Sequence, residues 1–162
     1  MPLIIRNVTQ DDLQSLIKIE ALCFPPSEAA DDKTLSERLM AYPESFFIAI
    51  YNNEPVGFID GAVTNSKTIS DDMFEDVKCH NPKGMYQSIF GLSVIPEARR
   101  IGVAAKLMNR MIENAKENGR RGLILTCKEH LIHYYEKFGY KNLGVSKSVH
   151  GGAVWYDMLL EF

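Results

Sequence analysis

The sequence has little of several features that would place it in a specialised class. Its three cysteines, Cys23, Cys79 and Cys127, are odd in number and widely spaced, which predicts neither a disulfide framework nor a metal site. No apolar run approaches the length of about 18 residues that a membrane-spanning helix needs. Positive charge is in slight deficit, with 18 Lys and Arg against 21 Asp and Glu, so nucleic acid and membrane surfaces are not expected partners.

The remaining composition is that of an ordinary globular protein. Hydrophobic residues make up 46% of the 162 residues and charged residues 24%, which predicts one domain over residues 1–162. The first residues lack the basic and apolar regions of a signal peptide, so a cytoplasmic location is expected.

Apolar periodicity and turn residues predict an alternation of strands and helices. Strands are expected at residues 3–8, 45–51, 55–63, 85–94, 121–127, 140–145 and 153–160. Helices are expected from residue 13 to near Phe24, at 33–40, 100–118 and 131–138, with one helical turn near 72–77. These elements predict an α/β fold: a single mixed, mostly antiparallel sheet of about seven strands, with helices on both faces. A parallel strand–helix–strand unit over residues 85–127 is expected at its centre.

The junction between the strand at 85–94 and the following helix is the most informative segment. Pro96 ends the strand, and Arg99, Arg100 and Gly102 lead directly into a helix. A helix N-terminus offers unpaired N–H groups and a positive dipole end, which together bind anions. The alternative is an ordinary surface helix preceded by two solvated arginines. Neither the Gly-Lys-Ser/Thr of a P-loop nor the three-glycine motif of a dinucleotide-binding fold is present.

Three motifs in order resemble the GNAT N-acetyltransferase superfamily. They are the strand Gly91–Val94, the signature Arg99-x-x-Gly102-x-Ala104, and the segment from Tyr135 through Phe138-Gly139-Tyr140. The residues 23–26 and 80–84 are similar to those of the arylalkylamine (serotonin) N-acetyltransferase-like branch.

The resemblance implies that acetyl-CoA is the co-substrate and that its acetyl group passes directly to a primary amine. It implies that the pantetheine arm pairs with the backbone of Leu92, Ser93 and Val94. It assigns the phosphate cradle to Arg99, Arg100, Ile101, Gly102, Val103, Ala104 and Ala105. Tyr135 matches the family's general acid, with Tyr134 as the neighbouring alternative. Cys127 is a further candidate nucleophile, although a buried strand residue is the simpler interpretation.

The acceptor side departs from the branch. Where that branch carries two histidines on the central strand, this chain has Ser88 and Phe90. Strand alternation predicts that both share one face with Tyr86, Leu92 and Val94. The base is left open among His80, His150 and Glu28.

The acceptor pocket is expected to involve Phe24, Pro25, Glu28, Ser88 and Phe90. The expected activity is acetylation of a small amine, an aralkylamine included, by a monomer or homodimer. The alternatives are a non-catalytic acyl-CoA-binding module and a protein lysine or N-terminal acetyltransferase.

Overall fold

The computed structural model describes residues 2–162 and places nine strands and five α-helices in them. The strands are β1 (Leu3–Asn7), β2 (Phe46–Tyr51), β3 (Glu54–Asp60), β4 (Val63–Thr64), β5 (Tyr86–Ile89), β6 (Gly91–Val94), β7 (Gly122–Cys127), β8 (Lys141–Val145) and β9 (Tyr156–Glu161). The helices are α1 (Leu13–Cys23), α2 (Asp32–Ala41), α3 (Asp71–Glu75), α4 (Val103–Glu117) and α5 (Ile132–Glu136). No helix among residues 2–162 is both long and apolar enough to cross a membrane.

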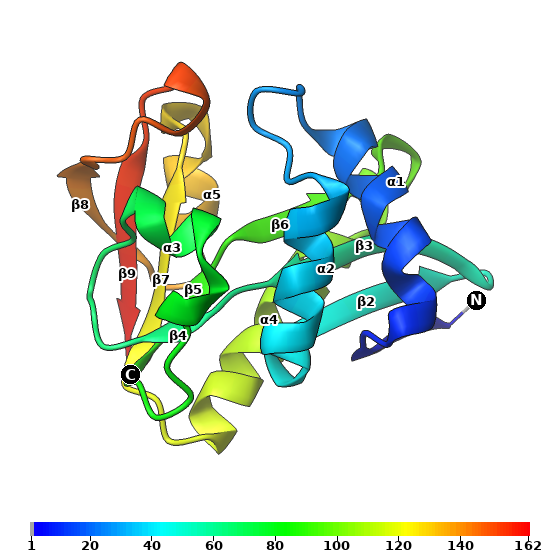
Figure 1. Ribbon diagram of the computed structural model, residues 1–162, viewed down its shortest axis with the longest axis horizontal. Helices are drawn as coiled ribbons and strands as arrows, with labels where there is room; N and C mark the ends of the chain where they lie inside the picture. The colour runs from blue at the N-terminus through cyan, green and yellow to red at the C-terminus, as the bar shows by residue number, and fades with distance from the viewer. Residues whose placement is uncertain (1) are drawn as a thin grey trace.

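The strands form two sheets, so the expected single sheet of seven strands is wrong. One sheet has the order β1-β2-β3-β6, and the other has the order β4-β5-β7-β9-β8. In Figure 1 the strands β2 and β3 of the first sheet run across the molecule, whereas β7 and β9 of the second run from top to bottom of the view. The expected parallel pairing is confirmed, because β5 and β7 are parallel and every other pair is antiparallel.

The sheets part where two neighbouring strands are each interrupted. Extended structure is interrupted between β3 and β4 and again between β5 and β6. As a result, β3 and β6 belong to one sheet, and β4 and β5 belong to the other. Gly61 allows the close crossing, since a Cβ there would lie 1.7 Å from the carbonyl oxygen of Ser88. The Gln87 amide donates to the carbonyl of Gly61 at 2.8 Å, and the Ser88 hydroxyl donates to the carbonyl of Ala62 at 2.6 Å. The Ala62 carbonyl also accepts from the Ser88 N–H at 2.8 Å, so the Gln87 side chain supplies a partner for the Gly61 carbonyl and the Ser88 hydroxyl adds a second bond to Ala62.

Residues 85–94 were expected to form one strand. The interruption at Phe90 divides this segment and reverses which face of the sheet its side chains point to. Tyr86 packs against the small core under α3, whereas Leu92 and Val94 pack into the core under α4. The predicted common face for these residues is therefore wrong, because a break of one residue moves every later side chain to the other face.

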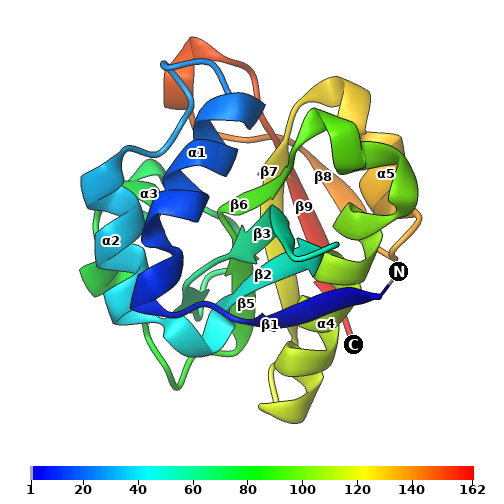
Figure 2. The ribbon, with the colours of Figure 1, turned by 90° about the vertical axis from the view of Figure 1, so that its right-hand side faces the viewer.

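Helices cover both faces of the first sheet, as expected (Figures 1 and 2). The buried residues Phe47 and Ala49 of β2 pack with α4, and the alternating residues Phe46 and Ile48 pack with α1 and α2. α4 starts at Val103 rather than at the expected Arg100, because residues Pro96–Ile101 form a 3-10 turn and Gly102 takes a left-handed conformation with φ of 78°.

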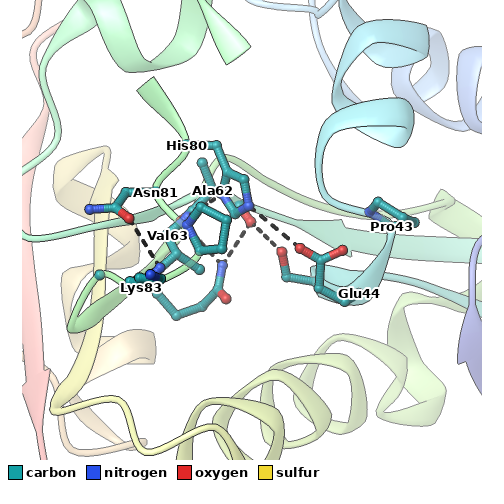
Figure 3. A network of polar contacts seen from close by, with 12 residues as sticks. Pro43, Glu44, Ala62, Val63, His80, Asn81 and Lys83 are labelled. Carbon is teal, nitrogen blue, oxygen red and sulfur yellow. Dashed lines mark hydrogen bonds and ion pairs between the residues drawn. The ribbon is translucent and has the colours of Figure 1, made fainter. Parts of the chain in front are cut away.

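The polar segment between β4 and β5 is held in place by His80 (Figure 3). Its Nδ1 accepts from the Val63 N–H at 3.0 Å, and its Nε2 lies 3.4 Å from Glu44 Oε1. Burial lowers the pKa of His80 below its usual range, and Glu44 opposes this shift. Nδ1 is therefore an acceptor in the folded protein, and His80 is a structural residue at this junction.

We expect His80 to make stability depend on pH. Its pKa is lower in the folded than in the unfolded chain, so the unfolded chain binds more protons below about pH 6.5, and the free energy of unfolding falls as the pH drops. Between about pH 7.5 and pH 5, the free energy of unfolding measured with urea should fall less for His80→Gln than for the wild type. His133→Gln is the control, because His133 is 84% exposed. Equal declines in the wild type and His80→Gln would contradict this account.

Candidate functional site

A cleft of about 700 Å³ lies where β6 and β7 diverge. Residues of β6 and β7, the C-terminal end of α1, the segment between α1 and α2, α5 and the loop before β9 line it. The cleft is therefore a direct consequence of the parting of the two sheets.

One wall of the cleft is an unpaired strand edge. Among the strands of residues 2–162, β6 pairs only with β3. The Ile95 N–H donates to Val56 O at 2.9 Å, and Ser93 stands opposite Phe58 in the same register. Because the backbone groups of an antiparallel strand alternate in direction, the N–H groups of Leu92 and Val94 point away from β3 and toward the divergence. The Val94 carbonyl accepts from Arg99 Nε at 3.0 Å and from the Cys23 thiol at 3.3 Å. The Leu92 backbone has no strand partner on that side and can pair with an extended amide-containing ligand.

The N-terminus of α4 follows this edge directly. Lys106 N–H donates to the carbonyl of Gly102, so the N–H groups of Val103, Ala104 and Ala105 precede the first intrahelical donor and have no acceptor within the helix. Gly102 opens onto free space, since no atom lies within 4 Å of where its Cβ would be. Free amides, a helix dipole and an unobstructed glycine suit a diphosphate.

Helix α5 brings two tyrosines to the opposite wall. The rings of Tyr134 and Tyr135 lie 5.2 Å apart, and both line the cleft. Burial raises the pKa of Tyr135 far above its usual range, and the neighbouring Cys127 and Tyr134 add to the rise. Burial also raises the pKa of Cys127 to about 11, so its thiol is protonated near neutral pH and is a weak nucleophile.

A buried carboxyl group, Glu20, lines the cleft beside β6. Its Oε2 accepts from the Ala30 N–H at 2.8 Å, and its Oε1 accepts from the Ser93 hydroxyl at 3.1 Å. Burial raises the pKa of Glu20, and these two hydrogen bonds oppose the rise. The group is thus fixed in position and is easier to protonate than an exposed glutamate, which suits proton exchange with a bound molecule.

Segments distant in the sequence meet over one end of the cleft. Glu28 pairs with Lys128 at 2.9 Å, and His150 Nε2 donates to the Glu28 carbonyl at 3.1 Å. Gly151 packs so closely here that a Cβ would lie 2.7 Å from Glu28 Cγ. Trp155 donates its indole N–H to the carbonyl of His150 at 2.8 Å. These contacts join the α1–α2 segment to the loop before β9, so this end of the cleft is covered.

The structure brings most of the predicted site residues to this cleft. The predicted residues that line it are Phe24, Pro25, Glu28, Phe90, Leu92, Ser93, Val94, Arg99, Ala104 and Tyr135. Arg100, Ile101, Gly102, Val103 and Ala105 lie outside that lining, on the turn and first helical residues at its mouth. Ser88 does not line the cleft because its hydroxyl is used at the junction of the sheets. Of the three proposed bases, His150 and Glu28 line the cleft and His80 does not.

Two buried charged residues of the lining were missed from the sequence, Glu20 and Arg38. Each occupies a core-facing position of its helix: Glu20 follows Leu16 and Ile17 at helical spacing, and Arg38 lies between the buried Leu35 and Leu39. A charged side chain on the apolar stripe of a helix was the signal that could have identified both.

Comparisons with known proteins agree with this geometry. The sequence model of the acetyltransferase (GNAT) family matches residues 13–140. The chain is 28% identical over 122 residues to the uncharacterized N-acetyltransferase YkwB of Bacillus subtilis, covering 68% of this chain and 54% of that protein. It covers 24% of a second Bacillus subtilis relative, the probable hydrolase YhcX, at 28% identity over 128 residues. The chain thus spans about half the length of the first relative and a quarter of the second.

Two further matches extend over nearly the whole chain. An N-alpha-acetyltransferase of Saccharolobus solfataricus is 26% identical over 147 residues, covering 88% of this chain and 83% of that protein. Among solved structures, the GphF GNAT-like decarboxylase in complex with isobutyryl-CoA superimposes with a TM-score of 0.85 at 16% identity, covering 98% of each chain. At that identity the superposition speaks for the fold alone.

Proposed function

The chain belongs to the acetyltransferase (GNAT) family, and we propose that it transfers the acetyl group of acetyl-CoA directly to the primary amine of a small molecule. The observation that carries this proposal is the unpaired edge of β6 in the wall of the cleft, leading into the free N-terminus of α4. A long ligand with amide groups at one end and a diphosphate at the other matches that sequence of features.

In this arrangement the pantetheine amides pair with the outward backbone groups of β6. The diphosphate lies against the N–H groups at the start of α4, and Arg99 and Arg100 add positive charge. The Leu92 N–H then faces the thioester oxygen and stabilises the negative charge that develops there during attack.

The chemical step is one acyl transfer with both substrates bound. The amine nitrogen forms a bond to the thioester carbonyl carbon, the carbon–sulfur bond breaks, and the electron pair leaves on sulfur. The amine must lose one proton and the sulfur must gain one. A covalent intermediate on the protein is not needed, since a thioester is already activated, and the protonated thiol of Cys127 agrees with direct transfer.

Tyr135 is the proposed donor to the leaving sulfur. Burial raises the pKa of its phenol, and burial in the same cleft also raises the pKa of the CoA thiol. The difference between these two pKa values, which governs proton transfer from the phenol to the sulfur, is therefore largely preserved.

Glu20 is the proposed base, acting directly or through one water. It is fixed by two hydrogen bonds, and its raised pKa makes it a stronger proton acceptor than an exposed carboxylate. This assignment replaces His80, which lies outside the cleft lining.

The covered end of the cleft supports a small acceptor. Aromatic side chains of Phe24, Phe74, Phe90 and Trp155 line it, which suits an amine with an apolar or aromatic group and keeps the aralkylamine branch in the proposal. The second candidate is acetylation of protein N-termini, which the relative named N-alpha-acetyltransferase favours. Release of free thiol from acetyl-CoA with small amines, and its absence with peptides, separates the two. Acetyl-CoA binding without thiol release from any amine or peptide would instead indicate a non-catalytic acyl-CoA-binding module.

We expect Gly102→Glu to abolish CoA binding, measured by calorimetry. The side chain adds bulk and negative charge where the diphosphate lies. Gly119→Glu is a matched control, because Gly119 lies beyond the other end of α4 with φ of 72° and equally free space. Unchanged CoA affinity in Gly102→Glu would refute the proposed cradle.

We expect Tyr135→Phe to lower kcat by about 10- to 100-fold and to leave CoA affinity unchanged, because only the proton donor is lost. Thiol release measures the rate. Tyr134→Phe removes the adjacent hydroxyl and should keep the wild-type rate. If the two variants exchange these results, Tyr134 is the acid.

We expect Glu20→Gln to lower turnover by about 100-fold and to remove the acidic limb of the pH–rate profile. In the wild type, the rate should rise with pH through a pKa above the ordinary value of about 4.3, because only ionised Glu20 accepts a proton. Glu75→Gln, an exposed carboxylate in the same lining, is the control. An acidic limb that persists in Glu20→Gln would assign the base elsewhere.

A further inference from the structure

Arg38 is a buried cation in the wall of the covered end of the cleft. It lies on α2 and is only 6% exposed. Its guanidinium carbon lies 5.1 Å from the centre of the Phe90 ring, and Nη2 donates to the carbonyl of Phe74 at 3.1 Å. Phe74, Phe90 and Arg38 all line the cleft, so the guanidinium is held rigidly at its surface.

The hydrogen-bonding capacity of this guanidinium is largely unused. A guanidinium has five N–H donors. Here the Nε is buried without a partner, and Nη1 is 3.6 Å from Asp60 Oδ2, which is an ion-pair contact beyond hydrogen-bond length. That same oxygen of Asp60 accepts from the Tyr42 hydroxyl at 2.8 Å instead.

The ion pair of Arg6 with Asp12 is a comparison from the same chain, in which the guanidinium of Arg6 makes a bidentate contact. Its two terminal nitrogens donate to the two oxygens of Asp12 at 2.8 and 2.9 Å. Arg38 and Asp60 are more deeply buried and make no such fork. Asp60 therefore balances the buried charge of Arg38 without consuming its donors.

Unused donors on a buried guanidinium are costly unless a ligand completes them, and Nη1, unlike the enclosed Nε, is open to a ligand. The chemical group that best matches a planar fork of N–H donors is a carboxylate, whose two oxygens accept in parallel. Of the carboxyl groups in the lining, the buried Glu20 is already engaged by Ala30 and Ser93, and Glu75 is exposed.

We propose that the acceptor amine also carries a carboxylate, which binds Arg38 while the amino group faces Glu20. This inference rests on the proposed function and narrows its substrate class to amino-acid-like amines. Glu20 lies near enough to Arg38 for the guanidinium charge to oppose the burial that raises the pKa of Glu20. A zwitterion brings no net charge into the cleft and presents each charged group to an opposite one, which limits the cost of burying both.

The first test compares matched acceptors on the wild-type protein by thiol release from acetyl-CoA. Phenylalanine, phenylalaninamide and 2-phenylethylamine share the amine and the ring, and only the first has a carboxylate. The corresponding triplets of acid, amide and decarboxylated amine of leucine and of methionine are also compared, to vary the side chain. The proposal expects kcat/KM at least about tenfold higher for the acid than for either partner. Equal or higher values for the amide and the plain amine would overturn it, as would a preference for peptides.

The second test changes the fork. Arg38→Lys keeps the charge, and Arg38→Met removes it. Both should raise KM for the acid at least about tenfold, leave KM for the plain amine unchanged, and leave CoA affinity unchanged. Arg6→Met is the control, since Arg6 is an ion-paired arginine outside the cleft lining. A purely structural Arg38 would instead lower activity equally with all acceptors. If Arg38→Met does not fold, as judged by its thermal melt, Arg38→Lys and the wild-type triplets still decide.

A separate readout distinguishes this inference from the proposed function. Calorimetry on the CoA-saturated protein measures binding of phenylalanine and phenylalaninamide without any turnover. Tighter binding of the acid that Arg38→Lys removes supports the anion site even if no amine is acetylated, and in that case the transferase proposal alone fails. Equal binding of the two, with normal turnover of the plain amine, overturns the Arg38 site and leaves the transferase proposal standing.

Discussion

A strand edge left without a partner is the feature on which the site depends. Backbone N–H and C=O groups inside a protein need hydrogen-bond partners, and a strand within a sheet normally finds them on both sides. Within the described residues 2–162, β6 pairs with β3 alone, because β7 pairs with β5 in the second sheet. The outward groups of β6 therefore face a cleft, where a ligand can supply the missing partners.

Maintaining that divergence requires specific residues away from the cleft. Gly61 permits a backbone approach that any side chain would block. The Gln87 amide supplies a partner for the Gly61 carbonyl, and the Ser88 hydroxyl adds a second bond to the Ala62 carbonyl. These residues lie outside the cleft lining and hold the junction from which β6 and β7 diverge. Ser88 illustrates the point: it was expected to contact a substrate, and its hydroxyl instead secures the junction.

The covered end of the cleft combines charged groups with apolar walls. Glu20 and Arg38 occupy positions on the buried, otherwise apolar stripes of α1 and α2. A charge there is unfavourable unless it is paired with an opposite charge or hydrogen-bonded. Each is held by hydrogen bonds or an aromatic ring, so each is positioned before any ligand arrives. Such positioning is what proton transfer and specific recognition require, because little rearrangement is then needed on binding.

Local information in the sequence was sufficient for much of this. The motif from Arg99 to Ala104, the apolar stripe of α4 and the two prolines after α1 depend on neighbouring residues, and they located the turn after β6, the helix that follows it and the end of α1. The parting of the sheets, the reversal of side-chain direction at Phe90 and the contact between Glu28 and His150 depend on residues far apart in the chain. Strand pairing and loop contacts are decided by the packing of the whole molecule, and a one-residue break has no distinct local signature. The sequence alone thus determined the family and the turn at which α4 begins, whereas only the tertiary structure placed Glu20 and Arg38 together in the cleft.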